Sequence, residues 1–360
     1  MTETLNLAPP DYRAALEGAA LYDEAAAGRI FMRGRDRADL LHRLSTNDIK
    51  RLQPGQGART VLTSPIGRII DLLTVHALED ALLVVTSPGQ GPAVYAHLRK
   101  NIFFQDQVTL EPAGRSHGQL ALYGPAAAGV LQRVLGVALA DLPLHHLVEV
   151  ALADQPNEPP VLVARREPIG GQGFTLYIPA GYLESTRQRL LDAGAAMLSP
   201  EAFDILRIEC GYGTFGRELS PEYIPLETGL LDAISFTKGC YVGQEIIARM
   251  ESRGRLAKQL RGLRLTAADG ASIAAHARDR LALITLPAKL EVAGKEAGDL
   301  TSAVVSPRFG PIGLAYVRTA HAAPGNIVGI AGTDLHAEVV TLPFDAAGPP
   351  DHDRGTLMAS

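Results

Sequence analysis

The sequence predicts an α+β protein with a C-terminal all-β part, because two portions of the chain differ in how their apolar residues are spaced. Before Gly254, short apolar runs alternate with amphipathic helical patterns, which is typical of strands mixed with helices. After Gly254, short apolar runs are separated by glycine, proline and asparagine, which indicates a small barrel or a sandwich. At 360 residues and 46% hydrophobic content, the chain can fill several cores.

The first part of the chain predicts strands and helices in alternation. Strands are expected at 29–33, 60–63, 69–75, 82–85 and 119–123, and helices at 37–45, 90–101 and 125–135. Asp36 is of a residue type that caps helices, and Leu40, Leu41 and Leu44 are spaced to form one buried side of the first helix. A turn at 65–67 joins the second and third strands into a hairpin.

The remainder of the chain continues this mixture and then changes to strands alone. Strands are expected at 161–165 and 174–178, helices at 182–193 and 200–209, and short apolar runs at 260–265, 283–286, 302–305, 312–317, 327–330 and 336–342. The polar, proline-rich segment 154–160 predicts an exposed loop. Residues 345–360, rich in glycine, proline, aspartate and alanine, predict a disordered tail.

Composition and charge exclude several classes of protein. Lysine and arginine total 34 against 39 for aspartate and glutamate, so the net charge of -5 provides no basic field for nucleic acid. The sequence shows neither a signal peptide nor an apolar stretch of membrane-spanning length, which favours a cytoplasmic protein with no membrane partner. Two cysteines are too few for a disulfide framework or a metal quartet, which fits a reducing compartment.

The histidines do not indicate a metal site. His145 and His146 are adjacent, but neither belongs to a spacing such as His-Glu-x-x-His, so a surface position is expected for both and no bound metal is predicted. No phosphate-binding loop follows a predicted strand, which removes the usual nucleotide-binding proteins.

One of only two cysteines lies in residues 238–245, which read Lys-Gly-Cys-Tyr-Val-Gly-Gln-Glu. A thiol that lies beside a cation and before a helix N-terminus ionises more easily than a free one, which favours a reactive Cys240. The same spacing is equally compatible with a small, buried Cys240 between two turn glycines. Cys210, beside Ile208, is expected in the core.

Residues 238–245 also resemble the Lys-Gly-Cys-Tyr-x-Gly-Gln-Glu signature of YgfZ-type proteins, which are tetrahydrofolate-binding relatives of the glycine-cleavage T-protein that support iron–sulfur enzymes. Segments 34–49, 62–71 and 300–317 are similar to further motifs of this superfamily and follow in its order. The resemblance implies a three-module cloverleaf with two α+β modules and a C-terminal β-barrel. The implied modules are a discontinuous one at 1–50 and 145–255, an inserted one at 51–144 and the barrel at 256–344.

The resemblance further implies a site for tetrahydrofolate or a derivative. Asp71 would accept hydrogen bonds from the pterin, Gln172 would contact the ring through its amide, and Arg207 would face the folate. Tyr241 would stack on a flat ligand. The chain departs from the aminomethyltransferase pattern twice, because Leu72 replaces the second of two adjacent acids and Gln172 stands in place of a glutamate.

These features predict a tetrahydrofolate-binding protein that assists the maturation or repair of iron–sulfur enzymes, with Cys240 as working thiol and Lys238 stabilising its charge. One thiol cannot hold a cluster, so any cluster contact would be shared with an iron–sulfur enzyme or an assembly protein. The alternatives are a folate-dependent aminomethyltransferase, which is a transferase, and a scaffold that binds only proteins. The residues leave open whether the chain turns over a substrate.

Overall fold

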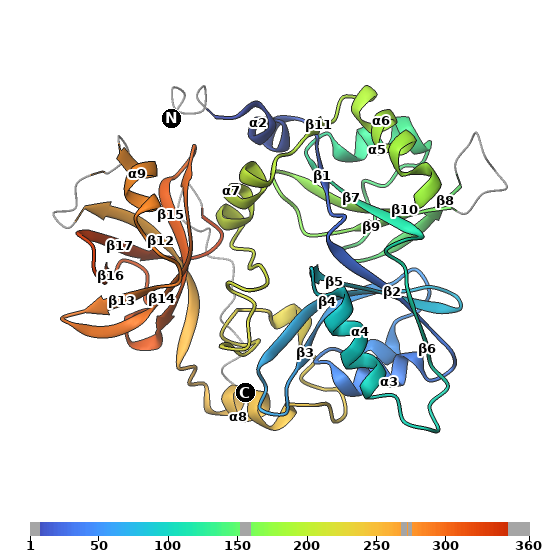
Figure 1. Ribbon diagram of the computed structural model, residues 1–360, viewed down its shortest axis with the longest axis horizontal. Helices are drawn as coiled ribbons and strands as arrows, with labels where there is room; N and C mark the ends of the chain where they lie inside the picture. The colour runs from blue at the N-terminus through green and yellow to red at the C-terminus, as the bar shows by residue number, and fades with distance from the viewer. Residues whose placement is uncertain (1–7, 152–159, 268–271, 273–275, 345–360) are drawn as a thin grey trace. The chain divides into compact units, whose positions relative to one another are not determined.

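The computed structural model describes residues 8–151, 160–267, 272 and 276–344 (Figure 1). These residues form two compact units, each of which is described by itself. The N-terminal unit contains Pro9–Phe203 and Asp232–Gln244, and the C-terminal unit contains Ala8, Asp204–Leu231 and the chain from Glu245 onward. The loop expected at 154–160, apart from its last residue, and the tail expected at 345–360 lie outside the described residues.

A five-stranded antiparallel sheet forms one part of the N-terminal unit. Its strands, in spatial order, are β3 (Gly57–Thr63), β4 (Ile69–Ala77), β5 (Ala81–Pro88), β2 (Ala27–Arg33) and β6 (Thr109–Pro112). The helices α3 (Arg37–Leu44) and α4 (Gly91–Lys100) cover one face of this sheet (Figure 1). The short helix η1 (Ile49–Arg51) follows α3.

Apolar side chains on one face of this sheet explain why the two helices pack there. Leu73 of β4 and Leu98 of α4 belong to one core. The expected buried side of α3 is confirmed, since Leu40, Leu41 and Leu44 are all buried and share that core. The predicted strands and helices of this part of the chain are therefore present, with slightly different ends.

The predicted N-cap of α3 is confirmed in its position but not in its hydrogen bond. Asp36 occupies the N-cap position, but its side chain makes no capping hydrogen bond. Its carboxylate instead accepts a hydrogen bond of 2.8 Å from the backbone N–H of Gln107. A partner from a loop distant in sequence therefore replaces the local one that the pattern indicates.

A six-stranded sheet forms the other part of the N-terminal unit. Its strands, in spatial order, are β11 (Ala196–Met197), β1 (Ala20–Asp23), β7 (His117–Gly124), β10 (Gln172–Pro179), β9 (Val161–Arg165) and β8 (Leu147–Val150). All pairs are antiparallel except β11 with β1. Helices α5 (Ala127–Leu135) and α6 (Leu183–Asp192) share its core, and α2 (Pro10–Glu17) and η2 (Ala180–Tyr182) lie in the same unit.

The two sheets of the N-terminal unit meet in a small core and at one buried histidine. Leu83 of β5 and Leu162 of β9 belong to this core. The imidazole of His76, on β4, donates from Nδ1 to the carbonyl of His145 at 3.0 Å and accepts at Nε2 from the hydroxyl of Tyr177 at 3.1 Å. Burial lowers the pKa of His76 to about 4, so the ring is neutral and has one donor and one acceptor for these partners.

The sheets divide the chain differently from the modules that the family resemblance implies. The five-stranded sheet takes its strands from residues 27–112, whereas the expected inserted module covers 51–144. Strand β2 precedes that module and joins its sheet, while β7 lies within it and joins the six-stranded sheet. The reason is that β2 pairs with β5 and β6, a choice of distant partners that no local pattern specifies.

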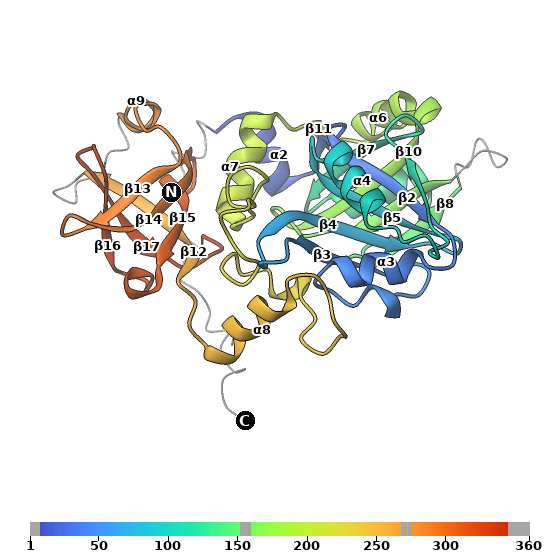
Figure 2. The same cartoon turned by 60° about the horizontal axis from the view of Figure 1, so that its bottom comes forward.

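A closed six-stranded barrel forms the C-terminal unit's core, which confirms the predicted fold class (Figure 2). Its strands, in order around the barrel, are β12 (Lys258–Ala267), β15 (Gly310–Arg318), β14 (Lys295–Ser306), β13 (Ala288–Val292), β16 (Ile327–Ile330) and β17 (Leu335–Val340). The expected apolar run at 283–286 is not a strand. It follows the short helix α9 (Ala277–Ala282); Ile284 and Leu286 pack on the barrel core, whereas Leu283 is exposed.

Further helices lie along the rest of the described chain. The helix α7 (Pro200–Cys210), the short helix η3 (Leu231–Ala233) and α8 (Gln244–Arg253) each contain a point where the chain passes from one unit to the other. The short helix η5 (Thr319–His321) lies between β15 and β16. Among the described residues, no helix combines the length and the apolar character needed to cross a membrane.

Gly57, at the start of β3, tests how tightly the two sheets are joined. A Cβ added there would lie 2.3 Å from the His145 oxygen and 2.7 Å from Nδ1 of His76. We expect Gly57→Ala to lower the free energy of unfolding by about 1–3 kcal/mol, because neither neighbour can move without breaking its hydrogen bond. Urea denaturation measures this. Gly181→Ala is the matched control, because no atom lies within 4 Å of a Cβ there, and equal losses for both variants would contradict the expectation.

Candidate functional site

A buried lysine anchors the segment 238–243, here called the thiol loop. The ammonium group of Lys238 donates to the backbone carbonyls of His42, Ser45 and Asn47, at 2.7 Å for Ser45 and 2.9 Å for Asn47. These carbonyls lie at and just beyond the C-terminal end of α3, where a helix leaves acceptors without partners. An ammonium group with three N–H bonds can satisfy three of them. Lys238 therefore joins the thiol loop to the end of α3.

Two further contacts hold the thiol loop against α3 and the β3–β4 hairpin. The N–H of Val242 donates to the carbonyl of Arg43 at 3.1 Å, and the hydroxyl of Thr63 donates to the carbonyl of Val242 at 2.5 Å. Gly243 has a φ of 84°, and a Cβ there would lie 2.6 Å from the backbone oxygen of Ser64. Only glycine therefore allows the thiol loop to lie this close to the β3–β4 hairpin. The loop is thus fixed on both sides of its thiol.

The thiol itself is accessible. Cys240 is exposed, as the reactive alternative requires, and Gly239 before it has no atom within 4 Å of an added Cβ. Helix α8 begins at Gln244, where the sequence predicts a helix start. Cys210, which the sequence places in the core, is half-buried, and burial raises the pKa of its thiol to about 12.

The contacts of Lys238 and Tyr241 limit the roles that the sequence indicates for them. Tyr241 is 9% exposed, and the Lys238 ammonium lies 4.9 Å from its ring centre, a cation–π contact. Stacking of Tyr241 on a flat ligand would require its ring to be uncovered. Because all three N–H bonds of Lys238 go to carbonyls, its effect on a Cys240 thiolate would act through space and not by a hydrogen bond.

Asp71 lies on β4 with its side chain completely buried. Its Oδ1 accepts the N–H of Leu72 at 3.0 Å, and its Oδ2 accepts the N–H of Ser87 at 3.1 Å. Burial outweighs these bonds and raises the pKa of Asp71 to about 6. Asp71 pairs with Leu62, the residue before Thr63, so one hairpin carries this acid and also holds the thiol loop.

Gln172 and Arg207, the remaining predicted ligand contacts, are engaged within the protein. The side-chain oxygen of Gln172 accepts the N–H of Ala128, in the first turn of α5, at 3.3 Å. Arg207, on α7, is buried and donates to the carboxylates of Asp204 and Glu218 at 2.6 and 3.2 Å. Gln172 belongs to the N-terminal unit and Arg207 to the C-terminal unit, so the predicted ligand residues are divided between the two.

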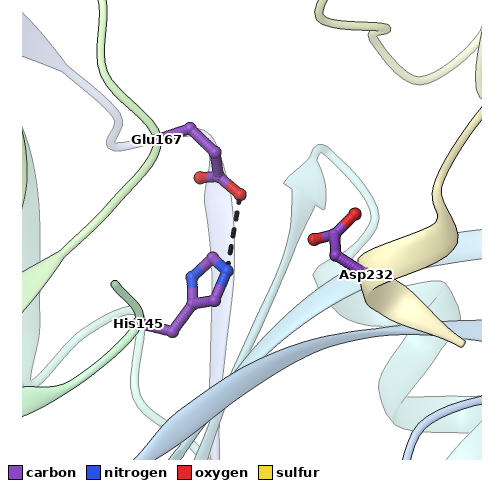
Figure 3. A group of neighbouring side chains, drawn as sticks. All are labelled: His145, Glu167 and Asp232. Atoms are coloured by element: carbon purple, nitrogen blue, oxygen red, sulfur yellow. Dashed lines mark ion pairs between the residues drawn. The ribbon is translucent and has the colours of Figure 1, made fainter. Parts of the chain in front are cut away.

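Sequence reasoning missed a group of three side chains in the N-terminal unit. His145, Glu167 and Asp232 come from separate segments of the chain, and their side chains face one another (Figure 3). The expectation of a surface position is wrong for His145, which is only 9% exposed. No local spacing could have indicated this group, because only tertiary folding brings the three segments together.

The fold and the sequence together define the class of protein. Two α+β sheets followed by a closed six-stranded barrel form a T-protein-like fold. Residues 6–238 match the GCVT N-terminal domain, and residues 258–345 match the glycine cleavage T-protein C-terminal barrel domain. The chain therefore belongs to the superfamily of the glycine-cleavage T-protein.

Relatives cover most of the chain. It is 31% identical to a putative chloroplastic transferase of Arabidopsis thaliana, over 92% of this chain and 73% of that protein. It is 31% identical to an aminomethyltransferase of Rubrobacter xylanophilus, over 93% of this chain and 85% of that protein. The glycine cleavage system aminomethyltransferase T from Bartonella henselae superposes with a TM-score of 0.79 over 92% of this chain and 88% of that one, which at 23% identity shows a shared fold.

Replacing Lys238 tests its anchoring role. We expect Lys238→Met to lower the free energy of unfolding by about 3 kcal/mol, because each buried acceptor without a partner costs about 1–3 kcal/mol. Chemical denaturation followed by circular dichroism measures this. Lys50→Met is the matched control, since the ion pair of Lys50 with Asp39 is exposed, is screened by solvent and should contribute little to stability. Similar losses in the two variants would show that the three carbonyls do not need Lys238.

The raised pKa of Asp71 makes stability depend on pH. Because the pKa rises from its ordinary 3.8 to about 6 on folding, the folded state holds the proton more tightly, and this stabilisation is lost as pH increases through that window. We expect the unfolding free energy of the wild type relative to Asp71→Asn to fall by about 2 kcal/mol from about pH 4 to about pH 7. Denaturant titrations across this range provide the comparison. A difference that is constant with pH would exclude the shift.

Proposed function

We propose that this protein binds tetrahydrofolate, or a derivative, and assists the maturation or repair of iron–sulfur enzymes through the thiol of Cys240. In this proposal it is a YgfZ-type member of its superfamily. The observation that carries the proposal is the thiol loop, in which Lys238 and Gly243 fix the backbone while Cys240 stays exposed. An exposed cysteine contributes little packing, so a rigid frame around it supports a chemical role.

A single accessible thiol defines the kind of partner. Cys240 can donate one thiolate to a cluster whose other ligands belong to a client enzyme or an assembly protein. It can also exchange with a disulfide of a client, in which the Cys240 thiolate attacks one sulfur and the other leaves as a thiolate. Both reactions need a protein partner and a reducing compartment, and the cytoplasm is the proposed location. Neither of the two cysteines is in a disulfide, which is compatible with that location.

Folate binding is supported by membership of the superfamily. Asp71, Gln172, Arg207 and Tyr241 are the side chains that we propose for the folate site. Each of them already contacts other groups of the protein, so they would either exchange these contacts for the ligand or orient the groups that touch it. The buried Arg207 fits the second alternative, because its guanidinium is held by two carboxylates.

The second candidate function is folate-dependent aminomethyl transfer, because a relative that matches over most of the chain is named an aminomethyltransferase. The residue after Asp71 counts against it. Where the aminomethyltransferase pattern has a second acid, this chain has Leu72, which can neither carry charge nor accept a hydrogen bond through its side chain. A scaffold that binds only protein partners is the third candidate, and it needs no folate at all.

Two assays on the purified protein separate these functions. Calorimetric titration with tetrahydrofolate should give saturable binding, whereas a scaffold should give none. Incubation with aminomethylated lipoyl carrier protein and tetrahydrofolate should leave the carrier unchanged, since we propose no aminomethyl transfer. Release of ammonia from the carrier at an enzymatic rate would instead establish the aminomethyltransferase.

The thiol is tested by a matched pair of cysteine variants. In cells that lack this protein, we expect Cys240→Ser to leave iron–sulfur enzyme activities at the level of the deficient cells, whereas Cys210→Ser restores them. Both variants should bind tetrahydrofolate as the wild type does, because serine is close to cysteine in size and neither cysteine is among the proposed folate residues. Full restoration by Cys240→Ser at equal protein abundance would remove the thiol from the function and leave folate binding to be judged separately.

A further inference from the structure

The backbone of His145 is strained and is held in place by its neighbours. Its φ of 64 lies in the left-handed region, which costs a residue other than glycine about 1–2 kcal/mol. The N–H of His145 donates to the carbonyl of Arg165 at 3.0 Å, and its own carbonyl accepts from Nδ1 of His76 at 3.0 Å. These bonds fix the direction of the imidazole. Strain that the surrounding structure maintains is a recurrent property of functional sites.

The imidazole of His145 makes no hydrogen bond to any described residue. Both ring nitrogens are buried, and His145 as a whole is 9% exposed. A buried polar atom without a partner costs about 1–3 kcal/mol. The ring is therefore placed to bind a group other than the protein's own donors and acceptors.

Two carboxylates face this ring (Figure 3). Nε2 of His145 lies 3.7 Å from Oε1 of Glu167, and one ligand atom from each of His145, Glu167 and Asp232 lies within 4.8 Å of the other two. Oε1 of Glu167 is buried as well and makes no hydrogen bond within the described part of the chain. An imidazole nitrogen with carboxylate oxygens is a ligand set that zinc and similar ions prefer.

Arg59 explains how the two carboxylates can lie together. Its Nε and Nη2 donate to Asp232 at 2.9 and 2.7 Å, and Nε also lies 2.9 Å from Oε1 of Glu167. Because Nε donates its hydrogen to Asp232, the contact with Glu167 is an ion pair without a hydrogen bond to Oε1. Arg166 also acts on Glu167 but pairs with Glu24 at 2.7 Å, so two arginines against three carboxylates leave one net negative charge beside the imidazole, which attracts a cation.

We propose that His145, Glu167 and Asp232 bind one divalent transition-metal ion, for which Zn²⁺ is the best match. Tetrahedral Zn²⁺ at about 2.0–2.2 Å from its ligands places the ligand atoms roughly 3.5 Å apart, so the group has to contract by about 1 Å. Asp232 is exposed on η3, so its side chain is the one that would move toward the other two ligands. Water would complete the fourth position, and Arg59 would hold the outer carboxylate oxygens.

The proposed ion would join three segments of the N-terminal unit. His145 precedes β8, Glu167 follows β9, and Asp232 lies on η3, which precedes the thiol loop in the chain. A bound ion would therefore stabilise the connection between the six-stranded sheet and the segment 232–244. This inference is independent of folate binding and of the role of Cys240.

Zinc affinity tests the site directly. The full-length Cys240→Ser protein, which lacks the exposed thiol, is treated with a chelator and titrated with Zn²⁺ in competition with a chromophoric chelator. The substitution His145→Asn is then introduced into this protein, because asparagine tolerates the left-handed backbone conformation and binds zinc poorly. We expect this change to weaken Zn²⁺ binding by at least about 100-fold. The matched control is His146→Asn, which removes the neighbouring imidazole and should leave the affinity unchanged.

A second variant covers the case in which His145→Asn does not fold. Glu167→Gln keeps the shape of the side chain and removes its charge. We expect Zn²⁺ to leave the melting temperature of the Glu167→Gln protein unchanged, whereas it should raise that of the His146→Asn control, which retains all three proposed ligands. Equal Zn²⁺ affinity in the His145→Asn and His146→Asn proteins would overturn the proposal. So would the absence of Zn²⁺ binding by the His146→Asn control.

Discussion

The ammonium group of Lys238 lies in the protein interior, where a charge is unfavourable unless hydrogen bonds replace its water shell. The carbonyls of His42, Ser45 and Asn47 provide those bonds, and they are acceptors that the end of α3 would otherwise leave unsatisfied. Each partner therefore removes a cost that the other would carry alone. Because this exchange holds the backbone of the thiol loop, Cys240 is exposed on a segment that is anchored on both sides. The proposed chemistry depends on that combination.

Several buried polar groups lie on or beside the β3–β4 hairpin of the N-terminal unit. Asp71 is completely buried on β4, and His76 on the same strand bridges to the carbonyl of His145 and the hydroxyl of Tyr177. Gly57 on β3 leaves the space that this bridge needs. Departures from an apolar interior are expected where a site, and not packing, decides the residue. The hairpin thus links the two sheets, the thiol loop and the group formed by His145 and its carboxylates.

The fold is shared with enzymes that bear the name aminomethyltransferase, yet a shared fold does not carry a shared reaction. The difference lies in a few side chains. Leu72 follows Asp71 where the enzyme pattern has a second acid, and Cys240 provides a thiol whose accessibility the backbone protects. Replacement of an acid pair by an acid and a leucine removes a negative charge from the proposed folate site, whereas an exposed thiol adds a nucleophile. Under the proposed function, the same scaffold would serve transfer in one member and thiol chemistry in another.

The sequence by itself determined the α+β and barrel classes, most element positions and the thiol loop, because apolar periodicity and an eight-residue signature are local properties. It also indicated an accessible Cys240 as one of two alternatives. Only the tertiary structure decided that the ammonium group of Lys238 donates all three of its hydrogen bonds to backbone carbonyls. It also decided that β2 pairs with β5 and β6, and that the carboxylate of Asp36 accepts a hydrogen bond from Gln107 instead of capping α3. Likewise, no local pattern in the sequence indicated that the segments containing His145, Glu167 and Asp232 lie side by side. Partner choice between remote segments depends on how whole sheets pack, and no short stretch of chain encodes it.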